Sequence, residues 1–109
     1  MTDMMLLMFA AHFLADYPLQ GDFVAKGKNR TAPIPGVPFW HPLTAHAAIH
    51  GGLVGIITGS TLLGCAETVI HWLTDDAKCR GWIGYNTDQA IHLACKMVWA
   101  FAVLKAGAP

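Results

Sequence analysis

The chain has 109 residues and a formal net charge of zero, and 54% of its residues are hydrophobic whereas only 13% are charged. This length suits one domain with a single core. The neutral charge argues against nucleic-acid binding, because proteins that bind the phosphate backbone usually carry a basic excess on one face. Four apolar segments with polar connections predict an all-α, four-helix bundle that is integral to a membrane.

The first predicted helix covers residues 3–19, where apolar residues recur at helical spacing as far as Pro18. Proline lacks the backbone N–H that continues a helix, so the helix is expected to end or kink there. His12 and Asp16 therefore lie near its end, and Gln20 follows four residues after Asp16.

The next segment, residues 21–41, is the one long connection, and its basic residues and prolines predict an ordered or semi-rigid loop. The second predicted helix covers residues 42–59, with Pro42 in its first turn, a position where proline is favoured. His46 and His50 lie in its first two turns. They are four residues apart and so share one face of the helix.

The third predicted helix covers residues 60–79, and the Ser60 side chain can cap its start. Glu67, His71 and Asp75 follow one another at intervals of four residues. A helix places these two carboxylates and the imidazole in one stripe.

The last predicted helix covers residues 87–105 and begins at Thr87, which can act as its cap. Asp88 falls in the first turn, where a carboxylate interacts favourably with the helix dipole. His92 follows one turn later, on the same face as Asp88.

Short turns between the last three helices favour up-down-up-down packing, which brings the polar residues of all four helices to one end of the bundle. The connections at that end are basic. Under the positive-inside rule they lie in the cytoplasm, which predicts a multi-pass protein of the inner membrane with lipid as its neighbour. The basic residues are Lys26, Lys28, Arg30, Lys78 and Arg80.

Imidazole and carboxylate groups together form the usual ligand set for zinc, manganese or ferrous iron, and we expect zinc. Ionisable side chains are costly to bury unless they are paired or bound to metal. A hydrogen-bonded network that fixes helix register and a path for ions or protons are the alternatives. The predicted ligands are His12, Asp16, His46, His50, His71, Asp75, Asp88 and His92.

A metal-dependent hydrolase of a phosphoester or lipid-linked substrate is one function that such a centre could serve. Glu67 or Asp75 would act as the base, and Lys78 would hold the anionic group. Asp76 is expected to face solvent. The alternative is a non-enzymatic membrane effector in which metal or a polar network holds the bundle together. Residues 21–41 are then the candidate contact for a protein partner, and oligomerisation stays open.

Four segments carry a resemblance to a family of small bacterial and phage membrane proteins catalogued as domain of unknown function 3307. They are HFLADYPLQGDFVAKGK, HAAIH, HWLTDDAK and DQAIHL. The resemblance implies a polytopic membrane protein and supplies no activity. The characteristic polar positions that it implies are His12, Asp16, Gln20, His46, His50, His71, Asp75, Lys78, Asp88, Gln89 and His92.

Overall fold

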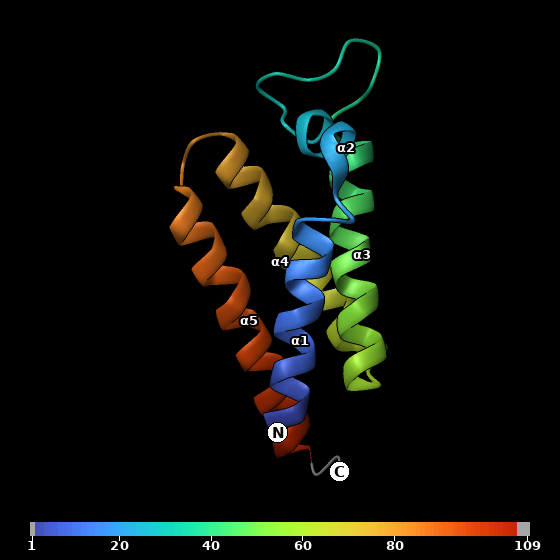
Figure 1. Ribbon diagram of the computed structural model, residues 1–109, viewed down its shortest axis with the longest axis vertical. Helices are drawn as coiled ribbons and strands as arrows, with labels where there is room; N and C mark the ends of the chain where they lie inside the picture. Colours follow the sequence, from blue (N-terminus) through green and yellow to red (C-terminus); the bar gives the residue numbers. More distant parts are fainter. Residues whose placement is uncertain (1, 107–109) are drawn as a thin grey trace.

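The computed structural model describes residues 2–106, and this part of the chain forms five α-helices (Figure 1). The all-α prediction is confirmed, whereas the prediction of four helices is wrong because a short helix forms within the expected loop. The four long helices alternate in direction. The helices are α1 (Thr2–Asp16), α2 (Gly21–Gly27), α3 (Trp40–Thr58), α4 (Thr61–Cys79) and α5 (Tyr85–Lys105).

Local sequence explains the additional helix and the end of the helix before it. α1 ends at Asp16, two residues before Pro18, because a residue that precedes proline is disfavoured in the helical conformation. The α2 segment contains no proline, and it places Asp22 in its first turn and Lys26 in its last. Both charges interact favourably with the helix dipole.

The two predicted caps have different outcomes. The Ser60 side chain accepts a hydrogen bond from the backbone N–H of Leu63 at 3.2 Å, which confirms it as the cap of α4. Thr87 is not the cap of α5, because the helix begins at Tyr85 and its N-cap residue is Gly84. The extended backbone of Gly84 starts the helix without a side-chain hydrogen bond.

The prediction of an integral membrane protein with cytoplasmic loops is wrong. Within residues 2–106, no helix has both the length and the apolar composition needed for a membrane crossing. α1 has 15 residues, against the roughly 20 apolar residues that a crossing requires. The other long helices have 19 to 21 residues, but polar side chains interrupt their apolar runs.

Glycines allow α3 and α4 to pack closely. A β-carbon at Gly64 of α4 would lie 2.8 Å from the backbone oxygen of Gly51 and 3.2 Å from the Cα of Gly55, both in α3. In contrast, α1 packs against α3 and α5, and its backbone does not closely approach that of α4 in the described chain. Side chains therefore bridge the space between α1 and α4, and at one level Oδ1 of Asp16 lies 4.0 Å from Nε2 of His71.

The Gly64→Ala variant is expected to lose about 2 kcal/mol of unfolding free energy. The added methyl group overpacks a helix interface, and the higher helix propensity of alanine offsets only part of that cost. Chemical denaturation measures the loss. Gly52→Ala is the matched control, because a β-carbon there meets nothing within 4 Å, and its stability should stay equal or rise. A Gly64→Ala variant as stable as the wild type would contradict the close contact.

The interior is apolar at one end of the bundle and polar at the other. A small apolar cluster of Met8, Val54, Trp99 and Ala100 comes from the first half of α1 and the later halves of α3 and α5. Many large apolar side chains point outward instead, as Ile56 does with 80% exposure. Burial of apolar surface is therefore limited, and the polar half needs specific contacts to hold it together.

Candidate metal centre

All four long helices contribute ionisable side chains to the polar half of the interior. Asp16 is slightly accessible, with 12% of its side chain exposed, and the others are buried. The predicted convergence of separate segments is therefore observed. The side chains are His12 and Asp16 of α1, His46 and His50 of α3, Glu67, His71 and Asp75 of α4, and Asp88 and His92 of α5.

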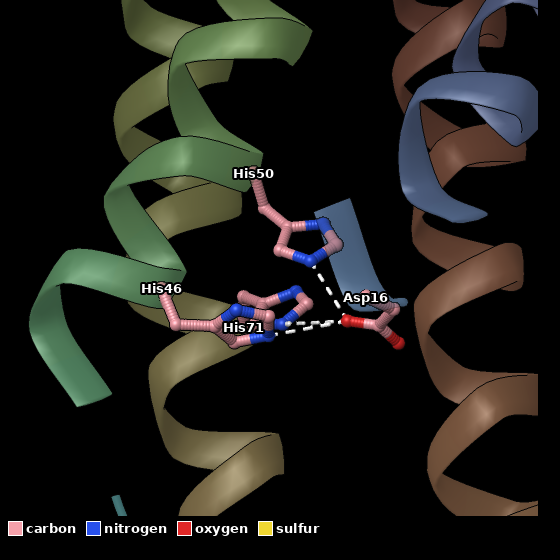
Figure 2. Close-up of side chains that lie close together, drawn as sticks. All are labelled: Asp16, His46, His50 and His71. Atoms are coloured by element: carbon pink, nitrogen blue, oxygen red, sulfur yellow. Dashed lines mark hydrogen bonds and ion pairs between the residues drawn. The ribbon is translucent and has the colours of Figure 1, made fainter. Parts of the chain in front are cut away.

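Three imidazoles surround one oxygen of Asp16 (Figure 2). Oδ1 of Asp16 lies 3.1 Å from Nε2 of His46, 2.9 Å from Nε2 of His50 and 4.0 Å from Nε2 of His71. The four donor atoms all lie within 4.8 Å of one another. A tetrahedral zinc ion about 2.0 Å from each donor separates its ligands by about 3.3 Å. The arrangement therefore has the size of a metal site.

The protonation states suit a cation. Burial lowers the pKa of His50 to about 3, although its contact with Asp16 acts in the opposite direction. Burial and the neighbouring imidazoles hold the pKa of His71 well below its usual value. Burial raises the pKa of Asp16, but hydrogen bonds from His46, His50 and Gln89 outweigh this and keep the pKa well below normal. His50 and His71 are thus neutral and Asp16 is ionised at neutral pH, as metal binding requires. Binding through Nε2 of His46 and His50 also requires that the protons these nitrogens donate to Asp16 move to Nδ1.

The Glu67 carboxylate fixes the orientation of the His71 ring. Nδ1 of His71 lies 3.1 Å from Oε2 of Glu67, so Nδ1 donates its proton there and the lone pair is left on Nε2. Within the described part of the chain, this buried Nε2 has no hydrogen-bond partner. A carboxylate that holds the far nitrogen of a histidine is the usual support for a metal ligand.

Glu67 is itself held by two donors from α5. Nζ of Lys96 donates to Oε2 at 2.8 Å, and the indole N–H of Trp99 donates to Oε1 at 2.8 Å. Sequence reasoning missed both residues. The signal was present for Lys96, because it follows Asp88 and His92 at intervals of four residues and so extends their stripe.

Asp75 lies at the edge of the donor set. Its Oδ2 is 3.6 Å from Nε2 of His46 and 4.0 Å from Nε2 of His71. The same oxygen accepts a hydrogen bond from Nζ of Lys28 at 2.7 Å, and this lysine is buried and also contacts Gln20. Sequence reasoning treated Lys28 as a loop charge, but it is the ion-pair partner of Asp75.

The predicted ligands of α5, together with His12, lie beside the four-residue donor set. Nε2 of His92 is 3.1 Å from Oδ1 of Asp88, and the His92 ring stacks on His71 with centroids 3.9 Å apart. Nε2 of His12 contacts the side-chain oxygen of Gln89 at 2.9 Å, and Gln89 donates to Oδ2 of Asp16 at 2.9 Å. His12 and Gln89 thus contact the Asp16 carboxylate, and the role of His12, Asp88 and His92 as metal ligands stays a prediction.

Lys78 and Asp76 have surroundings that the sequence did not predict. Lys78 lies over the Tyr85 ring, with Nζ 5.5 Å from the ring centroid. Asp76 does not face solvent as predicted, because it is buried between two arginines. Arg30 donates to both of its oxygens at 2.9 Å, and Arg80 donates at 3.0 Å. The basic loop is therefore fastened to α4 through Asp76.

Fold and site together define a helical protein with a buried cluster of histidines and carboxylates that can accept a metal ion. The chain belongs to the family described as Protein of unknown function (DUF3307), whose model matches residues 4–108. The family resemblance seen in the sequence is therefore confirmed. No curated protein and no solved structure matches the chain.

Proposed function

We propose that the protein binds one divalent metal ion, zinc, through Asp16, His46, His50 and His71. The observation that carries the proposal is the buried Nε2 of His71, which has no hydrogen-bond partner in the described chain and lies 4.0 Å from Oδ1 of Asp16. A buried polar atom without a partner is costly. A bound cation removes that cost, and three imidazoles with one carboxylate form a zinc ligand set.

The charges of the interior support a single divalent ion. Glu67 pairs with Lys96 and Asp75 pairs with Lys28. In the region that the structure describes, Asp16 and Asp88 contact no lysine or arginine and have only histidine and amide partners. Two carboxylates without a cationic partner, one buried and one only slightly accessible, are expensive. One divalent cation balances them.

A stabilising role for the ion has more support than hydrolysis. Both oxygens of Glu67 accept hydrogen bonds from its neighbours, so this proposed base has no free oxygen for a water proton, and Oδ2 of Asp75 is occupied by Lys28. The proposed anion-binding Lys78 lies over an aromatic ring instead. A cavity of about 430 Å³ between α3 and α4 is lined by none of the four ligands.

Titration of the metal-free protein with zinc tests the proposal. We expect one ion per chain by elemental analysis. At a free zinc concentration about 100 times the Kd, the unfolding free energy should rise by about 2.7 kcal/mol, which raises the Tm by about 10 °C. Manganese and ferrous iron, tested in the same way, should bind more weakly. Absence of a bound ion, or an ion that leaves the Tm unchanged, would reject the proposal.

A further inference from the structure

A second group of potential ligands lies on the other side of the His71 ring. Glu67, His71 and His92 each offer a donor atom, these atoms lie within 4.8 Å of one another, and all three residues are buried. His71 therefore belongs to two clusters. Its Nε2 lies near Asp16, and its Nδ1 lies near Glu67.

A neutral imidazole has one lone pair and one N–H, so it binds a metal ion through only one of its nitrogens. The two clusters that share His71 are therefore alternative sites rather than a two-metal centre. A feature of the protein must therefore determine which of the two clusters binds the ion.

The Lys96 side chain occupies the second cluster. It is 1% exposed, and its ammonium group lies 2.8 Å from Oε2 of Glu67, the oxygen that also accepts the N–H of His71. A metal ion bound to Glu67 at this point would have to displace the ammonium group and the proton on Nδ1. The ammonium group thus supplies the positive charge that a metal ion would otherwise bring.

We propose that Lys96 is the residue that selects the metal site: its ammonium group blocks the Glu67/His71/His92 cluster and directs the ion to Nε2 of His71. This inference rests on the proposed metal binding. It makes Lys96 a positioning residue, which acts on the ion through Glu67 and His71 and does not touch it.

The test measures how strongly zinc affinity depends on His92 and on His46, first in the wild type and then in the Lys96→Met variant. In the wild type, His92→Phe should change zinc affinity by less than about threefold, and His46→Asn should lower it at least about 30-fold. In Lys96→Met the dependence should shift, so that His92→Phe lowers affinity at least about tenfold and His46→Asn has a smaller effect than in the wild type. The tenfold and 30-fold thresholds lie within the 10- to 100-fold losses typical of residues that support a metal site, and the threefold threshold lies below them.

Nitrogen-15 NMR of the zinc-loaded histidines gives an independent result. Zinc should be bound to Nε2 of His71 in the wild type and in Lys96→Arg, which keeps the charge, and to Nδ1 in a substantial fraction of Lys96→Met. If Lys96→Met does not fold, Lys96→Gln replaces it, because glutamine removes the charge and keeps a donor for Glu67. Unchanged ligand dependence and unchanged Nε2 binding in the uncharged variant would overturn the proposal, whereas a wild type without zinc would overturn the metal site itself.

Discussion

Replacing His71 with phenylalanine should lower zinc affinity by more than about 100-fold, since loss of a residue that merely supports a ligand already costs 10- to 100-fold. In the proposed metal centre His71 is the donor that α4 supplies, and phenylalanine fills a similar volume without a nitrogen. The remaining donors, Asp16, His46 and His50, belong to α1 and α3. Competition with a chromophoric chelator measures the affinity.

His41→Phe is the control for this prediction. His41 is exposed at the start of α3 and its ring packs edge-on against Trp40, so its loss should leave zinc affinity unchanged. Equal affinity in the His71 and His41 variants would show that zinc binds elsewhere. Circular dichroism of both variants without metal checks that the helices are retained.

The Glu67→Gln variant should lose about 3–5 kcal/mol of unfolding free energy when measured without metal, which is the usual cost of removing one partner of a buried ion pair. The substitution keeps the shape of the side chain but leaves the buried Lys96 ammonium without its counter-charge. It also weakens the acceptor for Trp99. A domain has only about 5–15 kcal/mol of stability in total. The variant should therefore unfold at a clearly lower temperature than the wild type.

A double-mutant cycle identifies the cause of this loss. Adding Lys96→Met to Glu67→Gln removes the unpaired ammonium group and should restore at least half of the lost stability. Asp22→Asn, at an exposed position in α2, should change stability by less than about 0.5 kcal/mol. Additive losses in the double variant would mean that the charge pair contributes nothing specific.

Intervals of four residues predicted the histidines and carboxylates that meet in the interior, but not Lys28 and Lys96, which pair with two of those carboxylates. His46 with His50, and Glu67 with His71, lie on single helix faces, and alternating helix directions bring those faces together. The sequence could not show which atoms are closest. Whether a side chain joins the four-residue donor set or, like His12, contacts Gln89 instead depends on side-chain rotation, which spacing does not determine.

The membrane prediction failed for a reason that can be seen in the basic loop. Apolar helices joined by basic connections are typical of a multi-pass membrane protein, and Lys28 and Arg30 were interpreted in that way. In the structure both residues form ion pairs with neighbouring acids of α4, Asp75 and Asp76. These pairs join residues more than forty positions apart, and nothing in the local sequence indicates them.

The close contact between α3 and α4 has a consequence for how the metal centre assembles. These two helices are consecutive in the chain, and together they carry three of the four proposed ligands, His46, His50 and His71. In the proposed metal centre, a partly folded hairpin of α3 and α4 would already offer three of the donors, and α1 would complete the coordination by bringing in Asp16. The ion would thus favour docking of the N-terminal helix, and the affinity measured for the whole protein includes the free energy of that docking step.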